Sequence, residues 1–162
     1  MKDFTMRPLL FQRENMKMKE TQKLLEEFKR QSHGFGSVLL ACTSGSFGEG
    51  LDFPGNELLG AVIVGIPLAE MNVEVKALVN YYQERFGKGW EYGYTFPAMQ
   101  KAIQASGRVI RTPTDQGIVV LLDSRYAWEN YQKCLPPTQK FMVGQNPAEL
   151  VKQFWHAKQN NK

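Results

Sequence analysis

The chain has 162 residues, of which 43% are hydrophobic and 22% are charged, and this composition predicts one globular domain with a substantial core. No apolar stretch approaches the roughly 20 residues of a membrane-spanning helix, and no secretory signal is visible at the start. We therefore expect a cytoplasmic protein, nucleoid-associated if it is prokaryotic, without a membrane role. The net charge of +4 is compatible with a nucleic-acid partner but does not establish one.

The residues that most often bind metals are scattered along the sequence. Cys42 and Cys134 have no cysteine or histidine neighbour at metal-ligand spacing, and His33 and His156 are also isolated. We interpret the cysteines as structural thiols and the histidines as solvated or capping side chains. No metal site is expected.

The first elements predicted along the chain are two strands separated by a helix. Residues 9–11 and 38–42 are short, nearly unbroken apolar runs, which are typical of strands buried on both faces of a parallel sheet. Residues 18–30 carry apolar side chains at helical spacing, which predicts an amphipathic helix.

A glycine-rich segment, residues 43–55, follows the second predicted strand. Glycines at the carboxyl end of a parallel strand permit close approach of the backbone to a ligand, so the segment is either a ligand-binding loop or a structural turn. Its acids, Glu49 and Asp52, could accept hydrogen bonds from sugar hydroxyls, pair with arginines, or cap turns. The glycine order differs from the dinucleotide-binding fingerprint, and no Gly-Lys-Ser/Thr of a P-loop follows, so a dinucleotide-dependent enzyme is disfavoured.

The second half of the chain repeats the alternation of strands and helices. Residues 61–66 and 118–122 are predicted strands, and residues 72–86 form a predicted amphipathic layer helix. A third helix is expected to begin near Pro97 and to continue through residue 111. A final packing helix, residues 146–158, begins with an N-cap pattern. This alternation predicts a three-layer α/β domain that spans residues 1–162.

Gln104, Arg108 and Arg111 follow one another at spacings of four and three in the third predicted helix. They should therefore share one polar stripe. Arginine stays charged near neutral pH and offers a planar fork of donors, so a close arginine pair suits a phosphate group. The alternative is a solvated helix face that carries surface ion pairs.

Three segments, taken together and in order, resemble a known family. Residues 45–55, 104–111 and 115–126 resemble motifs V and VI and the following strand of the XPD/DinG-type superfamily 2 DNA helicases. The resemblance covers about residues 8–136. It implies the second RecA-like motor lobe, a three-layer α/β/α sandwich with a mainly parallel sheet that lacks the P-loop itself.

The resemblance also implies roles for particular residues. Arg108 and Arg111 match the motif VI arginines that contact the γ-phosphate of ATP, with Arg111 as the finger, and Gln104 matches the glutamine that organises the phosphate end. The motif V positions toward the nucleotide are Glu49, Gly50 and Asp52, and those toward single-stranded DNA are Ser46 and Phe47.

The P-loop, the Asp-Glu-x-His box and the four cysteines of an iron-sulfur cluster are absent from this sequence. In the family these parts belong to the first lobe and its insertions. We therefore expect a lobe that binds no iron-sulfur cluster and shares an ATP and Mg²⁺ site with a separate first lobe. The chain also begins at what resembles an internal strand of the family's second lobe, residues 7–12, so we expect the lobe to be N-terminally incomplete. Such a chain should not hydrolyse ATP usefully by itself, although its parent protein is expected to be an ATP-dependent DNA helicase. An exposed sheet edge would favour homo-oligomers.

A stand-alone RecA-like module that binds a nucleic acid or a protein without catalysis is the alternative hypothesis. Aromatic residues are frequent between positions 81 and 94, and Arg85 and Lys88 lie among them. Such residues could stack on bases, or they could pack the end of a helix.

Overall fold

The computed structural model describes residues 7–42, 53, 57–110, 112, 115–137 and 141–159. The elements in chain order are β1 (Leu9–Phe11), α1 (Met18–Ser32), β2 (Val38–Leu40), β3 (Gly60–Val64), α2 (Val73–Phe86), a π-helical turn η1 (Glu91–Thr95), α3 (Phe96–Ser106), β4 (Ile118–Leu122), a 3-10 turn η2 (Ser124–Ala127), α4 (Glu129–Gln132) and α5 (Pro147–Gln159). Within these described ranges, no helix is both long and apolar enough to cross a membrane.

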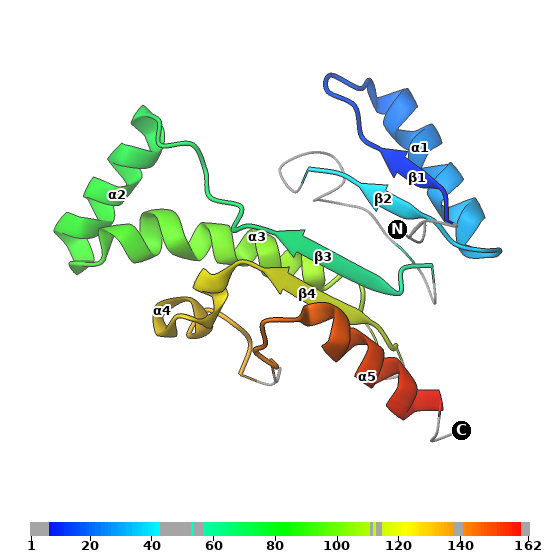
Figure 1. The fold of residues 1–162 in the computed structure, drawn as a ribbon. Helices are drawn as coiled ribbons and strands as arrows, with labels where there is room; N and C mark the ends of the chain where they lie inside the picture. The colour runs from blue at the N-terminus through cyan, green and yellow to red at the C-terminus, as the bar shows by residue number, and fades with distance from the viewer. Residues whose placement is uncertain are drawn as a thin grey trace.

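The strands form two parallel pairs. β1 pairs with β2, with Leu9 opposite Val38, and β3 pairs with β4, with Gly60 opposite Ile118. All four arrows point in the same general direction in Figure 1. The α/β class and the parallel strands are therefore confirmed, but β2 and β3 end earlier than predicted, and the described strands form two sheets rather than one.

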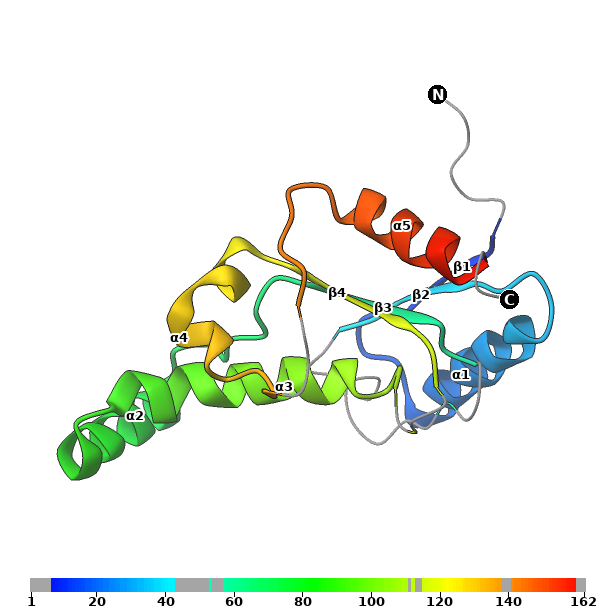
Figure 2. The ribbon, with the colours of Figure 1, turned by 90° about the horizontal axis from the view of Figure 1, so that it is seen from below.

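Helices lie on both faces of the strands. α1 and α3 lie on one side and α5 lies on the other (Figure 2), so the predicted three layers are confirmed. α5 begins as the sequence predicts, because the Asn146 Oδ1 accepts a hydrogen bond of 3.3 Å from the amide of Glu149.

The hydrophobic core lies between α3 and the β3–β4 pair. Ala98, Met99 and Ala102 of α3 are buried against Ile63 of β3 and the aromatic side chain of Tyr126. Met99 is fully buried, with 0% of its surface exposed. Two alanines on the buried face let the helix approach the strands closely, and Met99 fills the remaining space.

The start of α3 differs from the prediction. The helical backbone already runs through η1, and Pro97 lies inside a longer helical segment rather than at its beginning. The Phe96 amide bonds to the Glu91 carbonyl, five residues back. Since Pro97 has no amide hydrogen and cannot make the usual bond to the fourth preceding carbonyl, a π-helical turn directly before it accommodates the break.

The helix predicted at 72–86 is present, but it does not cover the sheet. α2 begins at the cap of Asn72, whose Oδ1 accepts a hydrogen bond of 2.9 Å from Val75, and none of its residues is buried. It projects beside η1, away from the strands (Figure 1). The prediction of a layer helix is therefore wrong: the apolar stripe of α2 faces another helical segment.

Gly93 of η1 allows this helical arm to pack. A Cβ atom at Gly93 would lie 2.8 Å from the Cα of Val79 and 2.9 Å from its Cγ2. The aromatic rings of Tyr82 and Tyr92 meet edge to face beside this contact, with centroids 5.8 Å apart. Close backbone approach and aromatic packing together hold α2 against η1.

Apolar side chains remain exposed on the strands. Leu9 and Phe11 of β1 and Val62 and Val64 of β3 are all exposed. The prediction of strands buried on both faces is therefore wrong for β1 and β3, in which alternate side chains are exposed. Self-association through these side chains remains a proposal.

We predict that Gly93→Ala will destabilise the folded chain by about 1 to 3 kcal/mol, because the new methyl group overlaps backbone that cannot move without opening the arm. Urea denaturation followed by circular dichroism measures this change. Gly34→Ala is the matched control, since its nearest atom would be 3.9 Å away. Equal stability of the two variants would contradict this account of the arm.

Candidate functional site

The structure describes two of the residues that the sequence assigns to the site, Gln104 and Arg108. The remaining residues of the predicted site lie outside the described ranges: Ser46, Phe47, Glu49, Gly50, Asp52 and Arg111. The geometry of the site is therefore built from the end of α3 and from the strand ends beside it.

Gln104 and Arg108 lie on either side of the end of α3. Gln104 is exposed on the last turn of the helix, which ends at Ser106, and Arg108 is half-buried in the turn that follows. The prediction that the helix continues through residue 111 is wrong. The two side chains are close in sequence at one helix end, but they do not share a continuous helical stripe.

Val109 explains why the helix stops here. The amide of Arg108 bonds to Ala105 at 3.4 Å and the amide of Val109 bonds to Ser106 at 3.1 Å, which are the three-residue bonds of a tighter turn. This turn buries Val109, of which 3% is exposed. Burying a valine side chain stabilises by roughly 1.5 to 3 kcal/mol, so this burial favours the observed turn.

Gly117 leaves space for the Val109 side chain. A Cβ atom at Gly117 would overlap the Val109 Cγ1 and would lie 3.0 Å from the Leu59 carbonyl oxygen. Thr112 and Asp115 are hydrogen-bonded to each other: the Thr112 amide donates to Asp115 Oδ2 at 2.9 Å, and the Thr112 hydroxyl donates to Oδ1 at 2.7 Å. Arg108 is thus placed directly before a buried side chain that packs against Gly117.

A second polar group lies at the carboxyl end of β4. Arg125 donates to both carboxylate oxygens of Asp123, from Nε at 2.9 Å and from Nη2 at 2.7 Å. These hydrogen bonds lower the pKa of Asp123. Both residues lie in the segment 115–126 that carries the family resemblance, but the sequence analysis did not predict that they pair. The Asp-x-Arg spacing directly after an apolar run could have indicated this pair.

Tyr126 connects the ends of β3 and β4. Its hydroxyl donates to the Gly65 carbonyl oxygen at 3.0 Å. Burial, followed by the nearby charge of Asp123, raises the pKa of Tyr126 from 10.0 to about 12. The buried neutral phenol therefore fixes the relative position of the two strand ends.

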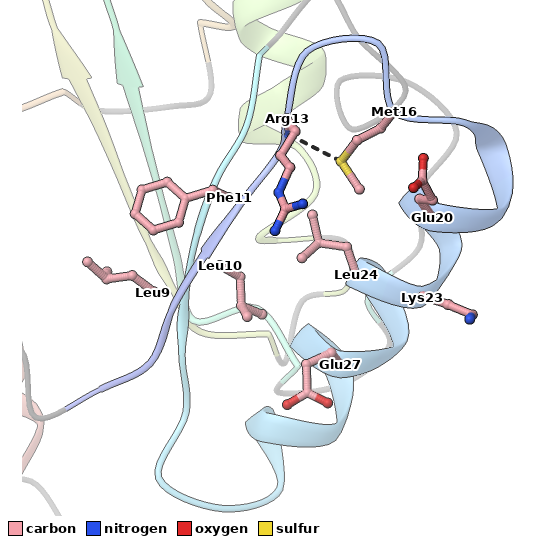
Figure 3. A pocket seen from close by; sticks show the side chains of 9 residues that line it. All are labelled: Leu9, Leu10, Phe11, Arg13, Met16, Glu20, Lys23, Leu24 and Glu27. Carbon is pink, nitrogen blue, oxygen red and sulfur yellow. Dashed lines mark hydrogen bonds between the residues drawn. The ribbon is translucent and has the colours of Figure 1, made fainter.

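A groove lies elsewhere, between β1 and α1, with a volume of about 590 Å³. In Figure 3, Leu10 and Leu24 point toward one another across it, and its rim carries charges of both signs. Two of these charges are already engaged: Glu20 accepts from the Lys17 amide, and Glu27 accepts from Arg30. The groove contains none of the predicted site residues, and we assign it no ligand.

The donor types of Gln104 and Arg108 fit a phosphate group, because an amide and a guanidinium both donate hydrogen bonds to phosphate oxygens. A bound metal ion would need a different set of residues. In the part of the chain that the structure describes, no group of three or more His, Cys, Asp or Glu residues could hold a metal.

The family described as "Helicase C-terminal domain" matches residues 2–140. The chain therefore belongs to this family, and it is of the XPD/DinG type of superfamily 2 helicases, as its relatives show. The predicted class is confirmed.

The similar curated proteins include XPD helicases. The chain is 34% identical over 119 residues to "General transcription and DNA repair factor IIH helicase subunit XPD" of Schizosaccharomyces pombe, covering 72% of this chain and 15% of that protein. It is 31% identical over 115 residues to the XPD/RAD3 subunit of Saccharomyces cerevisiae, covering 70% and 15%. It is 33% identical over 123 residues to a "Probable ATP-dependent helicase" of Methanocaldococcus jannaschii, covering 70% and 18%. The chain thus spans less than a fifth of each relative.

A solved XPD helicase structure is similar in fold. Its TM-score is 0.59 at 22% sequence identity, and the match covers 81% of this chain and 23% of that one. This likeness supports the RecA-like α/β fold that the sequence predicts.

We predict that Tyr126→Phe will lower the free energy of unfolding by about 1 kcal/mol, because it leaves the Gly65 carbonyl without its donor. The wild-type chain should also lose stability as the pH rises from about 10 toward 12. The folded pKa is raised above the unfolded one, so the contribution of the neutral phenol is complete below pH 10 and is lost as the folded group ionises.

Urea denaturation at several alkaline pH values measures both effects. Tyr126→Phe should show a smaller decline over this pH range than the wild type. Tyr81→Phe, which changes an exposed tyrosine, is the control. A Tyr126→Phe curve that matches the wild type at every pH would contradict the assigned bond.

Proposed function

We propose that this chain is the second motor lobe of an ATP-dependent DNA helicase, which contributes motifs V and VI to an ATP site shared with a first lobe. The observation that carries this proposal is the family match over residues 2–140, together with the Gln104-x-x-Gly-Arg108-x-x-Arg111 sequence at the end of α3. The packing of Val109 gives Arg108 a defined place at that helix end.

In this proposal the arginines act on a nucleotide that the other lobe holds. ATP with Mg²⁺ supplies the phosphoryl group whose transfer to water drives the motor. Arg111 and Arg108 would hold the γ-phosphate oxygens and neutralise the charge that develops on them, and Gln104 would orient the phosphate end. Glu49, Gly50 and Asp52 would face the nucleotide side of the glycine-rich segment.

The same segment would also contact DNA. Ser46 and Phe47 would meet the single strand, where a hydroxyl or a backbone amide can hold a phosphate. One segment between two ligands would couple the nucleotide state to the grip on the strand as the lobes close and open. We further propose that the parent protein translocates on single-stranded DNA and acts in DNA repair; the name of the XPD relative from Schizosaccharomyces pombe includes the words helicase and DNA repair.

A binding module without catalysis is the second candidate, and exposed aromatic residues favour it. Trp90 is 58% exposed, and its ring lies 5.0 Å from that of Tyr94 at an angle of 36°. Tyr81 and Phe86 are also exposed. Such rings could stack on bases. Titration with a labelled single strand at low salt tests this candidate, and no detectable binding would exclude it.

Arginine substitution tests the leading proposal. We predict that Arg111→Ala, in this chain joined to its natural first lobe, will lower the kcat of DNA-stimulated ATP hydrolysis by roughly a hundredfold or more. Arg108→Ala should have a smaller effect in the same direction, and folding should be retained.

The control is Arg30→Ala on α1. The Arg30 side chain is 73% exposed and pairs with Glu27. The substitution therefore removes an arginine that does not lie at the end of α3. Hydrolysis by Arg111→Ala that stays near the parent rate would show that the finger assignment is wrong.

A further inference from the structure

Phe53 lies at the end of the glycine-rich segment and is buried against α1. It is 7% exposed, as is Phe28 of α1. The two rings meet edge to face, with centroids 5.7 Å apart and planes at 85°. Neither ring belongs to the main core beneath α3, so this contact joins the segment to α1 locally.

Lys29 of the same helix also contacts Phe53, and it contacts Glu57, which lies just after the segment. Its ammonium nitrogen lies 5.6 Å from the centroid of the Phe53 ring and 3.6 Å from Glu57 Oε2. The two charged side chains are 31% and 16% exposed. An ammonium group over an aromatic face and beside a carboxylate is attracted to both, and the attraction is stronger where water is partly excluded.

Glu57 depends on this cation. Its Oε2 is buried and makes no hydrogen bond to any of the described residues. A buried carboxylate oxygen without a counter-charge is costly, so loss of the Lys29 charge should displace Glu57. α1 therefore contacts the chain at Phe53, within the segment, and at Glu57, two residues after it.

We propose that Phe53 is a positioning residue, fixed between Phe28 and Lys29, that anchors the glycine-rich segment to α1. This inference rests on the proposed function, in which the residues directly before Phe53 face the nucleotide and the DNA. Asp52 is the neighbour of Phe53 in the sequence. The anchor would therefore fix the end of the segment that carries the proposed nucleotide-binding and DNA-binding residues. A rigid support for a loop of this kind matters because small displacements of reacting groups reduce rates steeply.

The test uses this chain joined to its natural first lobe and compares Phe53→Leu, Lys29→Met and Lys29→Arg. Phe53→Leu and Lys29→Met should each lower the kcat of DNA-stimulated ATP hydrolysis by about tenfold and raise the DNA concentration needed for half-maximal stimulation. Lys29→Arg keeps the charge and can still lie over the ring, so it should remain within about twofold of the parent.

Ile63→Val is the packing control, because Ile63 is buried in the main core and its truncation loosens packing without touching the anchor. It should leave kcat unchanged well below the melting temperature. Hydrogen exchange of the joined protein gives a second measurement that does not depend on activity: amides of residues 43–52 should exchange faster in Phe53→Leu than in Ile63→Val.

The outcomes separate the two proposals. If Arg111→Ala leaves hydrolysis unchanged, the finger assignment in the proposed function is wrong, and the exchange measurement still tests the anchor. If Arg111→Ala abolishes hydrolysis while folded Phe53→Leu and Lys29→Met keep the parent kcat and DNA dependence, the anchor is overturned. Equal losses in Ile63→Val and Phe53→Leu, or in Lys29→Arg and Lys29→Met, would also overturn it.

Discussion

The contact of α3 with the β3–β4 pair positions Arg108 at the end of the helix and the polar residues at the ends of the strands. Met99 is fully buried between two buried alanines, so the axis of the helix is fixed close to the strands. Val109 is then drawn into the interior directly after the helix ends. Arg108 lies between these two buried points in the sequence, so its backbone position depends on the apolar packing on either side of it.

The strand ends depend on the same contact. Tyr126 packs in the core beneath α3 and donates a hydrogen bond to the carbonyl of Gly65. Asp123, directly after β4, pairs with Arg125. Apolar burial thus sets the layers, and short hydrogen-bonded links at the carboxyl ends of the strands set their finer alignment. Parallel α/β proteins bind their ligands at this edge, which is why the rigidity of this edge matters for the proposed motor role.

The sequence predicts the strands and the layers well because they depend on local composition. Unbroken apolar runs identified β1 and β4 at their observed bounds. Hydrophobic periodicity identified α2, but it could not tell whether the apolar stripe faces a sheet or another helix, and here it faces η1. The end of α3 was missed because the burial of Val109 against Gly117 is a tertiary contact between segments. The anchor formed by Phe28, Lys29, Phe53 and Glu57 was missed for the same reason, while Arg111 and the motif V residues remain predictions.

A site shared between two lobes is the central claim, and reconstitution of DNA-stimulated ATP hydrolysis tests it most directly. The rate would be measured for this chain alone, for the natural first lobe alone, and for the two joined. The account predicts substantial hydrolysis only in the joined protein, because the proposed arginines lie on this chain while the P-loop and the Asp-Glu-x-His box would lie on the first lobe. Hydrolysis at the joined rate by either part alone would contradict it.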